Sequence, residues 1–159
     1  MIDKSIDIDD LNVDHDFKLN QCVTLVSEAE PNKSVLATCL MQNGKRVLFR
    51  LLSDKQRTWG ITARNREQIF GMSLLMNPKI KLVSLIGKAG TGKTLMALAS
   101  GLEQTCEKGN IYHKVVVLRP IIPVGRDIGY LPGDVNSKMA PWVKPVMDNL
   151  SVLIGEDKT

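Results

Sequence analysis

Eight consecutive residues have the composition and spacing of a loop that binds phosphate: Gly87, Lys88, Ala89, Gly90, Thr91, Gly92, Lys93 and Thr94. The apolar run 81–86 before them predicts a buried strand, and the run 95–99 after them predicts a helix, which is the setting that this pattern requires. The glycines let backbone N–H groups approach phosphate oxygens, and the positive end of the helix attracts the same anion. Lys93 would charge-pair with the β- and γ-phosphates of a nucleotide, and Thr94 would offer a hydroxyl to Mg²⁺.

A second candidate site lies about 20 residues earlier, where Asn65 and Gln68 stand at the predicted start of a helix. The Gln68 amide can donate to N7 of adenine and accept from its amino group, which would make ATP the nucleotide. The same residues also fit a capping box, with Asn65 as the N-cap and Gln68 as the third helical residue. Residue chemistry alone favours the capping box.

Arg119 follows a second apolar run, 115–118, which predicts another buried strand, and it begins a long loop rich in Pro and Gly. In open α/β sheets, ligands bind at this edge. Arg119 could therefore hold a phosphate of ATP or of a nucleic acid, or it could simply fix the loop. Asp127 and Asp134 lie within the loop rather than at a strand end, so we do not expect either of them to hold a metal ion.

Charge is unevenly distributed along the chain. Residues 1–16 hold six Asp and one Lys within a net charge of +4, and we expect an acidic flexible tail there. The basic remainder could meet phosphate polymers, although ordinary solubility charge explains it as well. No run of 18 apolar residues predicts a membrane span, the start does not resemble a secretory signal, and we expect a cytoplasmic protein.

Hydrophobic periodicity divides the rest of the chain into two parts. Residues 17–61 are predicted to form a small β-rich segment, in which Asn43-Gly44 joins strands at 35–41 and 46–51. A third strand is expected at 21–27, and a short one around 58–61 is expected to close this sheet.

From residue 62 the period becomes helical. Helices are predicted at 66–76, 93–108 and 135–153, the last one interrupted near Pro141 and Pro145. Residues 62–159 are therefore predicted to form part of a P-loop NTPase core. The predicted fold class is α/β, with a partial parallel sheet and flanking helices that follow the β-rich segment.

Several separated motifs occur in an order that resembles the PhoH family of P-loop ATPases, in the branch where an RNA-cleaving PIN domain precedes the ATPase. They are Trp59-Gly60-Ile61, Arg64-Asn65, Glu67-Gln68, the loop 87–94, Arg119-Pro120-Ile121-Ile122-Pro123, Gly129-Tyr130-Leu131-Pro132-Gly133-Asp134, Lys138-Met139 and Pro141-Trp142. The resemblance covers roughly residues 57–150. It implies ATP and Mg²⁺ as cofactors, RNA as a partner, and a homo-oligomer in the intact family.

This family is similar to the core of superfamily 1 helicases, in which an Asn-x-x-Gln element recognises adenine. The resemblance therefore implies that Gln68, with Asn65, recognises adenine. It also implies that Arg119 contacts nucleic acid, because the equivalent strand end faces the nucleic acid in helicase cores.

The chain departs from the family pattern after Leu118. No apolar strand there ends in Asp-Glu, the Walker B element of the family, and no later arginine could serve as a finger. The ATPase domain of the family would continue for roughly another 100 residues, so 62–159 corresponds to its N-terminal half. We expect the missing C-terminal half or neighbouring subunits as partners, and the sequence identifies no catalytic residue.

Three functions remain open at this point. The order of the motifs favours an ATP-binding segment of a PhoH-like ATPase acting on RNA. The missing Walker B element favours a nucleotide-binding or interaction module that does not hydrolyse ATP. A small-molecule P-loop kinase is the third, and it would need an acceptor pocket and lid arginines that the sequence does not show.

Overall fold

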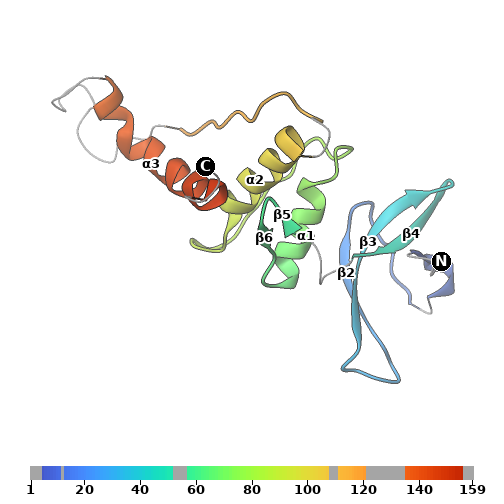
Figure 1. Ribbon diagram of the computed structural model, residues 1–159. Helices are drawn as coiled ribbons and strands as arrows, with labels where there is room; N and C mark the ends of the chain where they lie inside the picture. Colours follow the sequence, from blue (N-terminus) through green and yellow to red (C-terminus); the bar gives the residue numbers. More distant parts are fainter. Residues whose placement is uncertain (1–4, 12, 52–56, 108–110, 121–134, 156–159) are drawn as a thin grey trace. The chain divides into compact units, whose positions relative to one another are not determined.

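The computed structural model describes residues 5–11, 13–51, 57–107, 111–120 and 135–155, which fall into two compact units (Figure 1). The sheet unit comprises residues 1–57 and 62–83. The loop unit comprises residues 58–61 and 84–159, and it contains the phosphate-loop sequence. The chain therefore leaves the sheet unit at residue 58, returns to it at residue 62 and leaves it again at residue 84.

A four-stranded antiparallel sheet dominates the sheet unit, in the order β1-β4-β3-β2. Its strands are β1 (Ser5–Asp7), β2 (Cys22–Val26), β3 (Ser34–Gln42) and β4 (Lys45–Arg50). Asn43 and Gly44 join β3 to β4 with φ angles of 50° and 79°. Positive φ at both residues is what a two-residue hairpin turn needs, so the predicted Asn-Gly hairpin is confirmed, as is the strand predicted at 21–27.

One face of this sheet carries the core of the unit. Cys39 on β3 lies opposite Leu48 on β4, and Ala37 lies opposite Val23 on β2, so alternate residues of each strand point to one side. Phe17, from the segment before β2, joins Ala37, Cys39 and Leu48 in the buried cluster. The partly buried residues packed against this cluster are Ile8, Leu11, Val23 and Leu25.

The acidic N-terminal stretch contributes to this sheet, where we expected a flexible tail. Ser5–Asp7 forms β1 and pairs with β4, and a 3₁₀ turn follows at Ile8–Asp10. Apolar residues between the acids explain the difference, because Ile8 packs against the core and Ile6 lies opposite Leu48. Ile6 itself is 39% exposed, so the pairing of β1 with β4 and the partial burial of Ile8 offset the entropy that a polar tail would keep.

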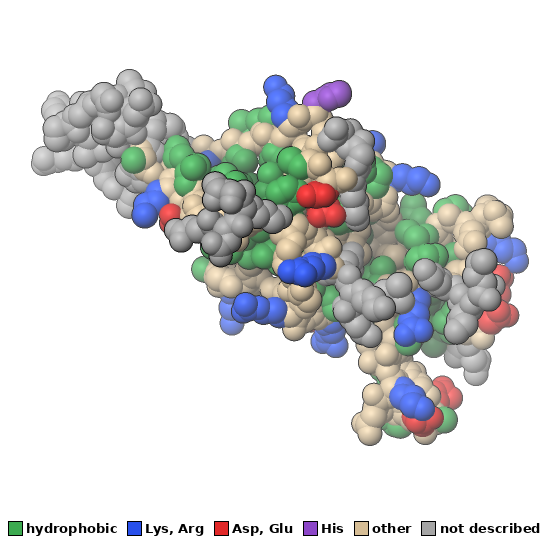
Figure 2. Space-filling view, viewed as in Figure 1, with side chains coloured by type: hydrophobic (Ala, Val, Ile, Leu, Met, Phe, Trp, Pro, Cys, Tyr) green, Lys and Arg blue, Asp and Glu red, His purple; other side chains and the backbone are tan. Residues whose placement is uncertain are grey.

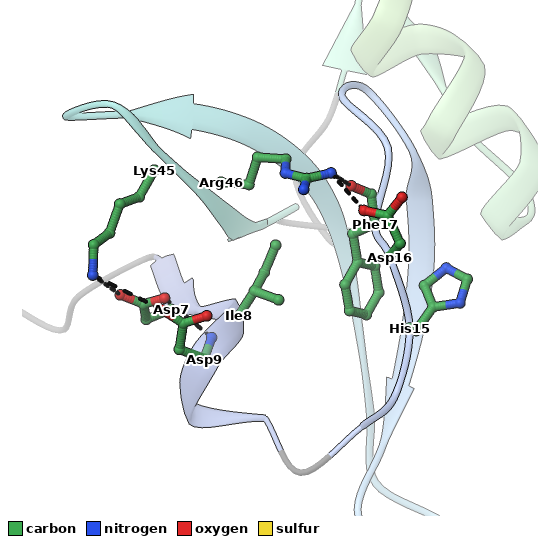
Figure 3. Close-up of a pocket in the computed structure, with 8 residues that line it drawn as sticks. All are labelled: Asp7, Ile8, Asp9, His15, Asp16, Phe17, Lys45 and Arg46. Carbon is green, nitrogen blue, oxygen red and sulfur yellow. Dashed lines mark hydrogen bonds and ion pairs between the residues drawn. The ribbon is translucent and has the colours of Figure 1, made fainter.

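Cations of β4 pair with Asp7, Asp9 and Asp16 around a hollow of about 210 Å³ (Figure 3). Lys45 Nζ lies 3.9 Å from a carboxylate oxygen of both Asp7 and Asp9, and Arg46 contacts Asp16 at 2.8 Å. Hydrogen bonds from Lys18 and Arg46 hold the pKa of Asp16 below its ordinary value. All of these groups are exposed or partly exposed, so the ion pairs contribute little to the stability of the sheet unit.

The helices agree with the prediction in position but not in every detail. Helix α1 (Arg66–Leu75) belongs to the sheet unit, whereas α2 (Lys93–Leu102), the π-helical turn Glu103–Glu107 and α3 (Val135–Ile154) belong to the loop unit. The predicted interruption of the last helix was wrong, because α3 continues through Pro141 and Pro145. A proline removes one backbone donor and can bend a helix without ending it. The expected end of the second helix near Gly109-Asn110 lies outside the described residues.

Helices α2 and α3 share the core of the loop unit. Its buried members are Leu98 and Ala99 from α2 and Leu153 from α3. A short hairpin, β5 (Arg57–Thr58) and β6 (Ile61–Thr62), contributes Trp59 and Ile61 to the edge of this cluster. The two strands form a sheet of their own, so the expectation that the segment around 58–61 closes the four-stranded sheet was wrong. No helix in the described ranges has the length and apolar character needed to cross a bilayer.

The apolar runs 81–86 and 115–118 have no strand partners among the described residues, and the predicted parallel sheet is not observed. Leu82 is 87% exposed, Ile86 93% and Leu118 89%, so the expected burial of these runs was wrong (Figure 2 shows hydrophobic side chains at the surface). An apolar sequence indicates a tendency to be buried but does not supply the neighbouring strand. One contact is formed, because Val115 Cγ2 lies 3.1 Å from the position that a Cβ would take on Gly101 of α2.

We predict that Leu48→Ala destabilises the sheet unit by about 2–5 kcal/mol, because Leu48 is fully buried and the smaller side chain leaves a cavity. Urea unfolding followed by circular dichroism measures the change. Val26→Ala is the matched control, since Val26 on β2 is 57% exposed and its loss should change stability by no more than about 0.5 kcal/mol. Equal effects of the two substitutions would show that Leu48 is not in the core.

Candidate phosphate-binding site

The loop before α2 turns at two glycines with left-handed backbone. Gly90 has a φ of 76° and Gly92 a φ of 82°, a region in which a residue with a Cβ is strained. Gly92 is also the N-cap of α2, and Met96 N donates to Gly92 O at 2.9 Å in the first turn of the helix. The chain therefore passes from the loop directly into a helix whose N-terminal N–H groups point toward the loop side. This geometry suits an anion.

The Lys93 ammonium lies over the loop itself. Its Nζ donates to the carbonyl oxygen of Gly87 at 2.9 Å, to that of Lys88 at 2.6 Å and to Thr91 Oγ1 at 3.1 Å. Thr91 Oγ1 in turn donates to Lys88 O at 2.9 Å. A positive charge is thus held within reach of any anion that the loop receives, and phosphate oxygens can replace its present acceptors.

Thr94 is the candidate Mg²⁺ ligand of the predicted set. It is the second residue of α2 and is exposed, as are Lys88 and Ala89 of the loop. In the ranges that the structure describes, no three His, Cys, Asp or Glu side chains gather in a possible metal site. A single hydroxyl is a weak ligand by itself, and Mg²⁺ is normally held jointly by protein groups and the phosphates of the nucleotide. Asp127 and Asp134 lie outside the described residues.

The structure confirms the capping geometry of Asn65 and Gln68. Asn65 has an extended backbone before α1, and its Oδ1 accepts from Gln68 N at 2.9 Å. The Gln68 side chain turns back, and its Oε1 accepts from Arg64 N at 2.7 Å. Gln68 belongs to the sheet unit and the phosphate loop to the loop unit, so recognition of adenine by Gln68 stays a prediction.

Arg119 is exposed, and its guanidinium makes a long contact with another described residue of the loop unit. Its Nη1 donates to the carbonyl oxygen of Trp142 on α3 at 3.4 Å. This contact connects Arg119 to α3, whereas the loop that Arg119 was expected to fix lies largely outside the described residues. The motifs at 121–134 lie outside the described residues, and contact of Arg119 with nucleic acid stays a prediction.

Sequence reasoning missed the role of Glu103. Its Oε2 accepts from Trp59 N at 2.8 Å, across 44 positions in sequence. Trp59 has a φ of 47° and Gly60 a φ of 78°, so this hairpin turns through a left-handed tryptophan. The indole packs against the core of α2 and α3, which explains why a bulky residue occupies that position. A Trp-Gly pair between short extended segments predicts the turn, but no nearby residue in the sequence identifies Glu103 as the acceptor for Trp59 N.

Comparison with known proteins places this site in a family. The profile of the family described as PhoH, PhoH-like protein, matches residues 60–159. Protein PhoH2 of Bacillus subtilis (strain 168) is 46% identical over 144 residues, which cover 91% of this chain and 32% of that protein. This alignment is longer than the family match, so it must include residues of the sheet unit before residue 60.

Two further relatives are more distant. A PhoH-like protein of the same Bacillus strain is 28% identical over the whole chain and 44% of its own length. Protein PhoH of Escherichia coli (strain K12) is 32% identical over 118 residues, which cover 74% of this chain and 32% of that protein. The chain thus spans less than half the length of these relatives. No solved structure matches it significantly.

The family match covers well over half of the chain and includes the entire glycine loop, the Lys93 ammonium and helix α2. The resemblance noted from the motif order is therefore confirmed. This chain belongs to the PhoH family, whose members are in general P-loop proteins that bind nucleotides.

Proposed function

We propose that this chain binds ATP with Mg²⁺ through residues 87–94, as part of a PhoH-like ATPase that acts on RNA. The observation that carries the proposal is the passage of the loop, through the left-handed Gly90 and Gly92, into a helix that begins with Lys93. Family membership supports a nucleotide in general terms. The choice of ATP and of RNA rests on the motif resemblance.

The residues present fit an ATP·Mg²⁺ complex at the phosphate end. Gly87 to Gly92 would surround the phosphates with backbone N–H groups, and Lys93 would neutralise charge on the β- and γ-phosphates. Thr94 would supply one ligand to Mg²⁺, which shields the phosphate charge when bound. Hydrolysis additionally needs a residue that orients water and a second group on the metal. We propose that these groups come from parts of the ATPase that correspond to the longer relatives.

The parts of the ATPase that correspond to the longer relatives would also cover the exposed apolar side chains of the loop unit. Ile86 and Leu118 are almost fully exposed, and Val116 is 62% exposed. Exposed apolar residues on extended segments favour pairing with further strands. We propose that a C-terminal ATPase half or a neighbouring subunit, as in a homo-oligomer, provides them.

Replacement of Lys93 by alanine tests the phosphate site. Loss of the ammonium removes a charged hydrogen bond to phosphate, worth about 1.5–3 kcal/mol, and should weaken ATP·Mg²⁺ binding at least roughly tenfold. Isothermal titration calorimetry measures the affinity. Lys79→Ala removes the same charge from an exposed residue outside the loop and should leave affinity as it is. Unchanged ATP binding in Lys93→Ala would refute the site.

Adenine recognition by Gln68 predicts a preference for ATP over GTP of about 1–3 kcal/mol, because guanine presents O6 in place of the amino group. Gln68→Ala should remove this preference in a competition assay. Its capping bond to Arg64 N is lost as well, so thermal stability must be measured in parallel. Glu67→Ala, one residue away and exposed, is the control. A fall in stability with selectivity retained would leave Gln68 only its capping role.

Contact between Arg119 and RNA predicts a change in salt dependence. Arg119→Ala should weaken binding of a single-stranded RNA and reduce the slope of log affinity against log salt by about 0.7, the value for one phosphate contact. Fluorescence anisotropy at several salt concentrations measures the slope. Lys33→Ala, whose ammonium is already bonded to Glu30, removes an equal charge as a control. A slope equal to that of the unchanged chain would assign Arg119 to its contact with Trp142.

A further inference from the structure

We infer that Thr91 holds the Lys93 ammonium in a retracted position that an incoming phosphate has to open, so that Thr91 sets the nucleotide affinity of the loop. The inference rests on the proposed function of residues 87–94. It concerns a residue at a variable position of the glycine-loop pattern, which specifies only glycines, the lysine and the final hydroxyl.

The hydrogen bonds of Lys93 carry the first step. A lysine ammonium has three N–H donors. Lys93 has three acceptors within 3.1 Å, namely Gly87 O, Lys88 O and Thr91 Oγ1. Its donor capacity is therefore filled inside the loop. Lys93 can donate to a phosphate oxygen only after at least one of these bonds is exchanged.

Thr91 is the one side chain among these acceptors, and a second bond fixes its orientation. The Thr91 hydroxyl donates its proton to Lys88 O at 2.9 Å, because a carbonyl oxygen can only accept. A lone pair of Oγ1 then faces the ammonium. Thr91 Oγ1 also lies 3.5 Å from the position that a Cβ would take on Gly87, so the hydroxyl is close to the backbone at the start of the loop.

Phosphate binding by Lys93 therefore competes with the hydrogen bonds that hold its ammonium against the loop. When only part of a population is competent to bind, the apparent dissociation constant rises in inverse proportion to the competent fraction. Removing the hydroxyl leaves the ammonium two carbonyl acceptors and opens the bridge to Lys88 O. We expect the competent fraction, and with it the affinity for ATP·Mg²⁺, to rise about threefold to tenfold.

The experiment is a double-mutant cycle on the full chain, with ATP·Mg²⁺ affinity measured by calorimetry. Thr91→Val replaces the hydroxyl by a methyl group at nearly constant shape and should bind about threefold to tenfold more tightly. Thr91→Ser keeps the hydroxyl and should return the affinity toward that of the unchanged chain. On a Lys93→Ala background, Thr91→Val should have no effect, because the group that it releases is gone.

Other outcomes separate the inference from the proposed function. Weaker or equal binding by Thr91→Val, reproduced by Thr91→Ala to guard against a poor fit of valine, would overturn the inference that Thr91 holds the ammonium back. A gain that persists without Lys93 would overturn it as well, since the effect would not act through the ammonium. In both of those cases Lys93→Ala still weakens binding, so the phosphate site would stand. If Lys93→Ala binds ATP as the unchanged chain does, both the phosphate site and the inferred role of Thr91 are refuted.

Discussion

The left-handed backbone at Gly92 is the constraint on which the loop unit depends. It turns the chain from the glycine loop into α2, so the first helical residue is Lys93 and its ammonium folds back over the loop. The same helix then supplies Leu98 and Ala99 to the core shared with α3. A residue with a Cβ at position 92 would strain this turn, and relief of that strain would change both the loop geometry and the direction of α2.

The C-terminal end of α2 is held by a hydrogen bond and by the packing of a side chain. Glu103, the first residue after the helix, accepts from the backbone of Trp59, and the indole covers the α2–α3 core. The cost of a left-handed tryptophan, of order 1–3 kcal/mol, persists only because packing and hydrogen bonding over-determine it. Helix α2 is thus held by the glycine turn at its N-terminal end and by the contacts of Trp59 at its C-terminal end.

Local signals in the sequence predicted local structure well. Asn43-Gly44 predicted the β3–β4 hairpin because two residues with positive φ are sufficient to define that turn. Asn65 predicted the start of α1 because its cap involves only residues within the first turn. The glycine loop before α2 belongs to the same class, since its pattern and its helix are adjacent in sequence.

Features that depend on distant partners were not predicted. The acidic composition of residues 1–16 concealed Ile6 and Ile8, whose partners lie on β4 and in the core some 40 residues away. Glu103 has no local signal, because its partner is 44 positions earlier. The runs 81–86 and 115–118 have the composition of buried strands, yet Ile86 and Leu118 stay exposed. Composition indicates that a segment can be buried, whereas only a paired neighbour makes it a strand.

The division of the chain into two units places a geometric requirement on the adenine proposal. Gln68 stands at the start of α1 in the sheet unit, whereas the phosphate loop lies in the loop unit. One nucleotide can engage both only if the two units are held in a fixed relation when it binds. The match to PhoH2 of Bacillus subtilis extends into the sheet unit, so that relative shares part of this unit as well as the loop.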